Sequence, residues 1–168
     1  MSLKDIINMH NREKEEKKQL RLRKKIEKKK TIEPMTREQI EEKGDIFELF
    51  KEKIDYRARC LEQKRIVDAN ITNKDIMTII DIMLEDFDKY KEFLLEQCKN
   101  GSYELKYSAS VICLRTGFNT NEALENLRYF ARHKKQNGVI AYEAREILKR
   151  FHEKRLPSYE GFEVQYKN

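Results

Sequence analysis

The chain has 168 residues, of which 39 % are charged and 39 % hydrophobic, and its formal net charge at pH 7 is +6. Its 5 glycines and 2 prolines supply too few turn-formers for a many-stranded β fold. No apolar run approaches the roughly 18 residues of a membrane-spanning helix, so the composition predicts an all-α protein without a membrane partner.

The N-terminal segment, residues 1–35, predicts a basic helical arm. Ser2 is a suitable N-cap, and the helix is expected to run to about Lys30. Residues 11–30 carry 11 Lys and Arg against 4 Glu, and residues 11–19 contain no apolar side chain. Because a helix that is polar on every side is not held by a core, we expect this arm to protrude or to become ordered on a partner.

The charge of the arm indicates a polyanionic partner. Residues 11–30 contribute +7 (11 − 4), so the rest of the chain sums to −1. Basic side chains around a helix suit a phosphate backbone, whose neutralisation releases counterions; an acidic protein surface and a solvated tail without a partner are the alternatives. The candidate nucleic-acid contacts in the arm are Arg12, Lys17, Lys18, Arg21, Arg23, Lys24, Lys25, Lys28, Lys29 and Lys30.

Residues 36–155 predict a small helical domain of about five helices. Thr36 and Gln39 form a capping-box pattern, and apolar residues spaced by three, four or seven predict a helix from there to about 69–70. Thr72 with Asp75 suggests the next N-cap, and that helix is expected to end at Asn100 and Gly101.

The segment 102–116 fits two secondary structures. Its first half alternates apolar and polar residues as a strand does, whereas residues 111–114 are continuously apolar. Because a lone strand without a partner is not stable, we predict a helix. Further helices are expected at 121–136 and 141–154, and the aromatic tail 156–168 is expected to be extended.

The stretch 109–128 resembles a helix-turn-helix DNA-binding motif. Cys113 stands where the motif has a small residue, Gly117 stands in the turn, and Ala123 and Leu127 would seat the second helix on the first. In that family the second helix lies in the major groove. The resemblance adds Asn119, Thr120, Asn121, Arg128, Arg132, Lys134 and Lys135 to the candidate nucleic-acid contacts.

Two features of this stretch depart from the motif. Glu122 and Glu125 lie at the start of the second helix, where carboxylates repel phosphates. Arg128 and Arg132 come later, where they also complement the helix dipole. Two packed helices joined by a glycine turn remain an alternative without any DNA contact.

The sequence contains no recognisable catalytic or metal-binding pattern. There is no glycine-rich phosphate loop and no His–Glu zinc motif, and the three histidines lack metal-ligand spacing. Neither a catalytic residue, a metal ligand nor a cofactor is therefore predicted, and the protein is not expected to be an enzyme. Cys60, Cys98 and Cys113 show no short paired spacing, which together with the lack of a signal peptide favours a reducing, cytoplasmic location.

These observations favour a small nucleic-acid-associated protein, with DNA preferred to RNA. Such a protein would be a regulator or accessory factor of replication, transcription or packaging. The alternative is a non-enzymatic structural, adaptor or inhibitor protein that docks into a larger assembly through the charged helix and the C-terminal tail. Self-association of the helical body stays open.

Overall fold

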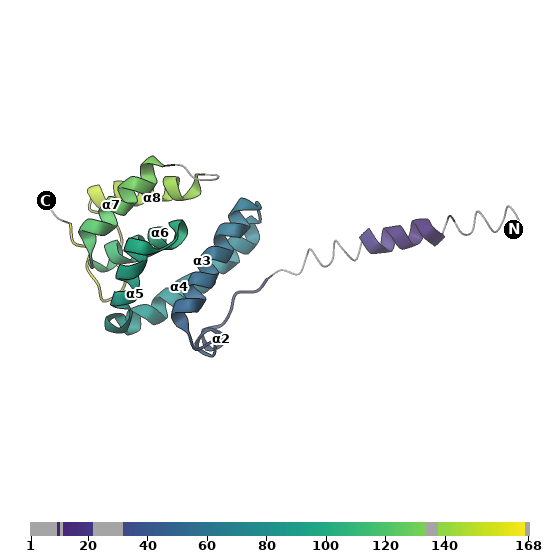
Figure 1. The fold of residues 1–168 in the computed structure, drawn as a ribbon, viewed down its shortest axis with the longest axis horizontal. Helices are drawn as coiled ribbons and strands as arrows, with labels where there is room; N and C mark the ends of the chain where they lie inside the picture. Colours follow the sequence, from purple (N-terminus) through teal and green to yellow (C-terminus); the bar gives the residue numbers. More distant parts are fainter. Residues whose placement is uncertain (1–9, 11, 22–31, 134–137, 167–168) are drawn as a thin grey trace, which may run out of the picture. The chain divides into compact units, whose positions relative to one another are not determined.

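The computed structural model describes residues 10, 12–21, 32–133 and 138–166, and every regular element in these ranges is helical. The chain forms two compact units, Met1–Glu33 and Pro34–Asn168, and we call the second the helical body. Its helices (Figure 1) are α2 Arg37–Glu41, α3 Ile46–Glu62, α4 Ile66–Glu85, α5 Phe87–Asn100, α6 Tyr103–Thr116, α7 Thr120–Arg132 and α8 Val139–His152. The predicted all-α class is confirmed, whereas the expected count of about five helices is not, because the described residues of the body form seven.

The N-terminal unit is described over its middle part only. Residues 12–21 are helical and their side chains are exposed. The proposed N-cap Ser2 and the helix end at Lys30 lie outside the described residues.

Two helices that the apolar spacing predicts as continuous are each divided. The first is split into α2 and α3 by Gly44, whose φ is +81°, and by Asp45, which caps α3 by accepting a hydrogen bond from the Glu48 amide. It also ends earlier than predicted, at Glu62, where Lys64 adopts a positive φ of 57°. The second is interrupted at Asp86, with φ −128° and ψ 58°, which separates α4 from α5.

The ambiguous segment 102–116 is the helix α6. Ser102 caps it by accepting a hydrogen bond from the Leu105 amide, and Gly117 ends it in the left-handed conformation. Both faces of this helix are largely buried, and Ile112, Cys113 and Leu114 are each no more than 1 % exposed. Its apolar run therefore reflects a helix enclosed on several sides and not a strand.

Helices that follow one another in sequence pack side by side. α3 lies on α4, α5 on α6, α6 on α7 and α7 on α8, while α3 also contacts α6 and so closes the body (Figure 1). A single core runs through these contacts, and its largest fully buried side chains include Phe50, Leu94, Leu127 and Phe130. Within the described ranges, no helix combines the length and the apolar character needed to cross a bilayer.

A buried carboxylate fixes the point where the chain enters the body. Asp75 on α4 is 1 % exposed and accepts hydrogen bonds from the Met35 amide at 2.8 Å and from Lys53 Nζ at 2.7 Å. A buried charge is tolerated when it is paired and hydrogen-bonded. Asp75 therefore joins α3, α4 and the segment that precedes α2. The sequence pattern, which placed Asp75 in the first turn of a helix, does not predict this role.

Candidate nucleic-acid interface

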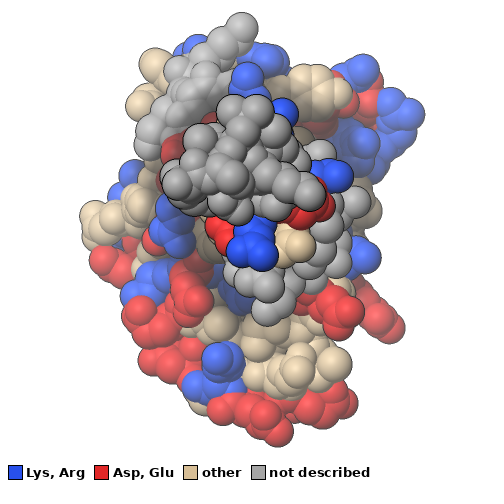
Figure 2. Space-filling model, turned by 90° about the vertical axis from the view of Figure 1, so that its right-hand side faces the viewer, with Lys and Arg blue, Asp and Glu red and all other residues tan. Residues whose placement is uncertain are grey.

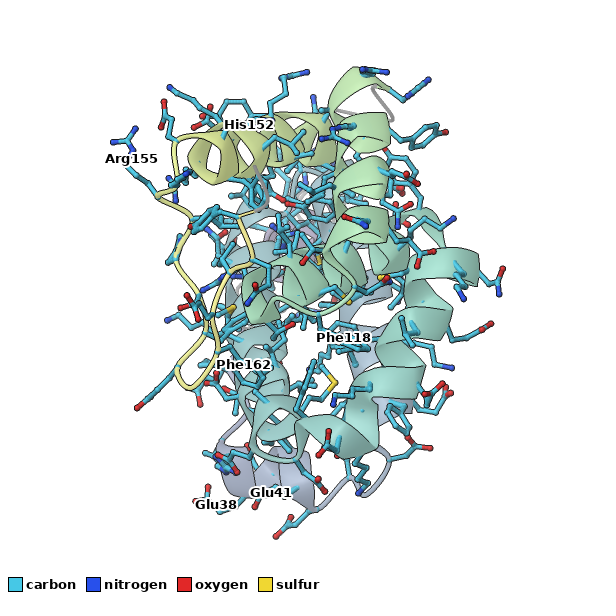
Figure 3. All side chains as sticks on the ribbon, turned by 90° about the vertical axis from the view of Figure 1, so that its left-hand side faces the viewer. Glu38, Glu41, Phe118, His152, Arg155 and Phe162 are labelled. Atoms are coloured by element: carbon cyan, nitrogen blue, oxygen red, sulfur yellow. The ribbon has the colours of Figure 1, made fainter. Side chains whose placement is uncertain are left out.

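Charge is separated along the helical body. Residues 37–48 and 81–92, which form α2 and the surroundings of the α4–α5 junction, carry 10 acidic and 4 basic side chains. The described residues 128–133 and 138–155 carry 7 basic and 3 acidic side chains. Figure 3 places Glu38 and Glu41 at one end and His152 and Arg155 at the other. On the face in Figure 2, acidic side chains crowd the lower edge, and basic ones are prominent at the upper right.

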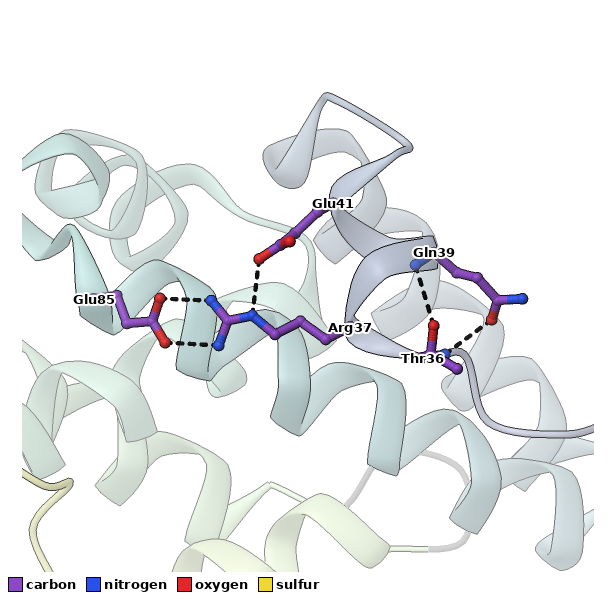
Figure 4. Close-up of polar contacts among 5 residues, drawn as sticks. All are labelled: Thr36, Arg37, Gln39, Glu41 and Glu85. Atoms are coloured by element: carbon purple, nitrogen blue, oxygen red, sulfur yellow. Dashed lines mark hydrogen bonds and ion pairs between the residues drawn. The ribbon is translucent and has the colours of Figure 1, made fainter.

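The acidic end is tied together by one arginine. Arg37 on α2 donates to both carboxylate oxygens of Glu85 on α4, at 2.7 and 2.5 Å, and to Glu41 at 2.8 Å (Figure 4). These bonds lower the pKa of Glu85 below its ordinary value. The predicted capping box is confirmed beside it, since Thr36 and Gln39 exchange their side-chain and backbone hydrogen bonds.

The basic end is formed where α3, α7 and α8 meet. Arg57 on α3 pairs with Glu143 on α8 at 3.3 Å, and Arg145 donates to the Ala131 carbonyl at the end of α7 at 3.0 Å. These contacts hold the ends of the three helices together. The exposed basic side chains of α7 and α8 here are Arg128, Arg132, Arg145, Lys149 and Arg150, and Arg59 and Arg65 are exposed in the last turns of α3 and just after it.

Two tyrosines stand exposed in this basic end, and the sequence reasoning did not select them. Tyr129 on α7 is 52 % exposed and Tyr142 on α8 is 61 % exposed. The Tyr129 ring stacks on His133 with 4.2 Å between ring centroids and 23° between planes. Helical periodicity was the available signal, because both tyrosines fall opposite the apolar faces of their helices.

Three residues of the helix-turn-helix resemblance lie in the contact between α6 and α7. Cys113, Ala123 and Leu127 are fully buried between the helices. Gly117, with φ +69°, ends α6, and the Phe118 amide donates to the Cys113 carbonyl at 3.0 Å, which closes the turn. This packing is equally that of two helices joined by a tight turn.

The start of α7 is poorly placed to contact a ligand. Thr120 is 6 % exposed, which corrects the expectation that its hydroxyl could reach a nucleic acid. Asn119 is partly buried and donates to the Glu122 carboxylate at 2.7 Å, while Asn121 is exposed. Of the three candidates here, only Asn121 is thus freely presented.

The C-terminal tail lies against this turn. Arg115 stacks on the Tyr159 ring at 3.9 Å from its centroid and donates to the Pro157 carbonyl at 2.9 Å. The Phe162 ring meets Phe87 edge-on at 5.0 Å, near Phe118 (Figure 3). The tail is not helical, but it is not extended as predicted: it turns at Glu160 and Gly161 and folds back, so that the Tyr166 hydroxyl donates to the Leu156 carbonyl at 2.7 Å. Its apolar side chains pack on its own chain.

The candidate contacts of the arm and of the loop before α8 are only partly described. Arg12, Lys17, Lys18 and Arg21 lie on the exposed helix 12–21. The candidates outside the described residues are Arg23, Lys24, Lys25, Lys28, Lys29, Lys30, Lys134 and Lys135.

No metal-binding cluster of three or more His, Cys, Asp or Glu side chains occurs among the described residues. The three cysteines are buried free thiols. Cys98 Sγ lies 3.7 Å from Cys113 Sγ, and this contact lowers the pKa of Cys98 while it raises that of Cys113. Asn126 donates to the Cys98 carbonyl and to Ser110 Oγ, both at 3.0 Å, so the pair sits in a bonded, enclosed environment.

Comparison with known proteins yields no match: no family model, no curated protein and no solved structure corresponds to this chain.

Proposed function

We propose that the protein binds nucleic acid through its phosphate backbone, using the basic arm and the basic end of the body. It would act as an accessory factor or regulator of replication, transcription or packaging. DNA is the first candidate because the stretch 109–128 resembles a helix-turn-helix DNA-binding motif in the spacing of its residues. No catalytic step forms part of this proposal.

The observation that carries the proposal is the charge separation of the body. Surface charge for solubility alone is served by mixed signs, whereas a basic end opposite an acidic one creates a field that attracts and orients a polyanion. Arg128, Arg132, Lys149 and Arg150 are all exposed at the basic end, and none has a carboxylate partner among the ion pairs found in the described residues.

The proposal is tested by binding to DNA and RNA at several salt concentrations, followed by fluorescence anisotropy. The logarithm of the affinity should fall linearly with the logarithm of the salt concentration, and each phosphate contact contributes about 1 to the slope. Replacing Arg132 and Arg150 by Gln should lower the slope by about 2. Neutralising Lys24, Lys25, Lys28, Lys29 and Lys30 together should weaken binding further.

A matched control removes the same net charge from the acidic end. Lys43→Gln with Lys89→Gln changes two exposed lysines, one beside α2 and one at the start of α5. Its salt slope should equal that of the unaltered protein, because these lysines lie among carboxylates that repel phosphates. Equal weakening by the two double variants, or no binding at low salt, would contradict the proposal.

One observation favours the second candidate function, a non-enzymatic adaptor. Ile66, Val67 and Met77 are exposed on α4, and Ile66 and Met77 lie three turns apart on one face of that helix. Exposed apolar residues that gather on a surface often mark a protein contact. Failure to bind any nucleic acid at low salt, with a stable protein complex that Met77→Ser disrupts, would support the adaptor function.

A further inference from the structure

The Tyr129–His133 pair is exposed but makes hydrogen bonds and ring contacts with the rest of the body. His133 Nδ1 lies 2.8 Å from the Tyr129 carbonyl oxygen, and the His133 carbonyl accepts a hydrogen bond from the Tyr103 hydroxyl at 3.1 Å. The Tyr129 ring also meets the buried Phe130 ring edge-on, with 5.7 Å between centroids. The two stacked rings therefore form a surface that is fixed by the core beneath it.

Exposure of these rings is unusual within this protein. The chain has 8 Tyr and 8 Phe, all of which fall within the described ranges. Tyr129 and Tyr142 alone among them are exposed, and both stand at the basic end. Tyr142 shares a face of α8 with Arg145 and Lys149, at spacings of three and seven residues. Tyr142 thus stands beside cations on α8, and Arg145 links this face to the end of α7 through the Ala131 carbonyl at 3.0 Å.

We propose that this surface, the Tyr129–His133 stack with Tyr142 and the surrounding arginines, binds single-stranded nucleic acid by stacking unpaired bases. The inference rests on the proposed function and specifies the form of its ligand. Every base has an aromatic face, and stacking on a protein ring combines with phosphate contacts in single-strand binding. A duplex, in contrast, offers phosphates and groove edges, because its bases are already stacked on one another.

The junction of α6 and α7 argues in the same direction. A helix that reads a duplex groove contacts base edges with residues of its first turn. Here Thr120 is buried, Asn119 bonds to Glu122, and a Cβ on Gly117 would lie 2.2 Å from the Glu163 carbonyl oxygen of the tail. The first turn of α7 thus presents only Asn121 freely, whereas Arg128, Tyr129 and Arg132 are exposed in its second half.

The experiment compares the full-length protein and its variants on single-stranded DNA, single-stranded RNA and a DNA duplex of equal length. Tyr129→Ala should lower the affinity for at least one single strand by roughly 5- to 150-fold, the range that loss of one stacked base gives. Tyr129→Phe keeps the ring and should bind as the unaltered protein does. Affinity for the duplex should be the same in all three proteins.

A fluorescent variant reports on the stacking itself. The chain contains no Trp, so Tyr129→Trp introduces one indole into the platform. Its emission should be quenched by a single strand and not by the duplex, while Met77→Trp, on the exposed face of α4, should be quenched by neither. Equal quenching at the two positions would overturn the stacking mode.

The failures of the two proposals are distinguishable. Unchanged single-strand affinity in Tyr129→Ala, with a lowered salt slope in Arg132→Gln/Arg150→Gln, would overturn the platform and leave phosphate binding in place. Equal losses of single-strand and duplex affinity in Tyr129→Ala would also overturn it. Absence of any binding at low salt would overturn both.

Discussion

At the scale of single residues, the ion pair between Lys53 and Asp75 differs in kind from the pair between Arg37 and Glu85. The side chains of Lys53 and Asp75 are 17 % and 1 % exposed, whereas those of Arg37 and Glu85 are 42 % and 60 % exposed. Removing one partner of a buried pair leaves an uncompensated charge, while exposed pairs contribute little. Burial, and not the number of hydrogen bonds, should therefore decide which pair stabilises the fold.

Lys53→Met should lower the free energy of unfolding by about 3–5 kcal/mol, because it leaves the buried Asp75 carboxylate without its cationic partner. Arg37→Met, which removes a bidentate but exposed pair, should produce a much smaller change. Urea denaturation of both variants under the same conditions measures the difference. A similar loss in the two proteins would show that burial is not the deciding factor.

Buried tyrosines should make the protein sensitive to alkali. Burial raises the pKa of Tyr107 far above its ordinary value, and the neighbouring Glu143 carboxylate raises it further; burial also raises the pKa of Tyr159. Above the unfolded-state pKa of about 10, the unfolded chain loses these protons while the folded chain keeps them. Stability is therefore fully present below pH 10 and falls as the pH rises towards the folded-state pKa values.

Tyr107→Phe should flatten this decline. One retained proton corresponds to about 1.4 kcal/mol of unfolding free energy per pH unit, so the variant should lose stability more slowly between pH 10 and 11. Urea midpoints at closely spaced pH values measure the slope. An identical slope in the two proteins would mean that Tyr107 ionises in the folded state as readily as in the unfolded state.

At the scale of elements, the turn after α6 depends on a glycine for two separate reasons. Gly117 has a φ of +69°, and a Cβ there would lie 2.2 Å from the Glu163 carbonyl oxygen. Gly44 has a similar φ of +81° but no atom within 4 Å of such a Cβ. A substitution at Gly44 therefore tests backbone strain alone, whereas one at Gly117 tests backbone strain together with the close approach of the tail.

Gly44→Ala should cost about 1–2 kcal/mol, the strain of a left-handed alanine. Gly117→Ala should cost more, because the backbone of the tail must move away as well. Thermal unfolding measures the stabilities, and limited proteolysis should cut the tail between Leu156 and Tyr166 faster in Gly117→Ala only. Equal proteolysis of the two variants would contradict the predicted contact.

Local sequence signals predicted some element boundaries correctly and one wrongly: the expected N-cap at Thr72 with Asp75 lies inside α4, which begins at Ile66. The capping box at Thr36 and the glycine stop at Gly117 act through their own neighbours, and both were predicted correctly. Asp86 carries no breaker signal, since the apolar spacing continues from α4 into α5. The helix is interrupted there because α4 packs on α3 whereas α5 packs on α6. No local sequence pattern records this difference in packing.

At the scale of the whole molecule, charge along the sequence anticipated part of the candidate site. The acidic segments 37–48 and 81–92 and the described basic residues of 128–155 lie toward opposite ends of the body. The burial of Thr120 could not be foreseen, because it results from the folded arrangement of the α6–α7 turn. The exposure of Tyr129 was accessible from helical periodicity, but its stacking on His133 depends on the support of Tyr103 from another helix.

The location of the core predicts that the body determines the free energy of unfolding, whereas both units contribute to the affinity for nucleic acid. The core cluster of the body and the partly buried residues packed against it run from Met35 to Tyr166, so the described residues of the N-terminal unit contribute none of them. Deleting residues 1–31 should therefore change the free energy of unfolding by no more than about 0.5 kcal/mol, as for surface changes. It should nevertheless weaken nucleic-acid binding and lower its salt slope, because 11 basic residues are lost from 11–30.

Binding should not vanish in this truncated protein, since the basic end of the body remains. Its residual affinity should depend on Tyr129 and Arg132 more strongly, in relative terms, than that of the full chain. Urea denaturation and anisotropy titrations on the same preparations measure both properties. A large loss of stability would show that the N-terminal unit supports the fold, and an unchanged salt slope would show that the arm does not contact phosphates.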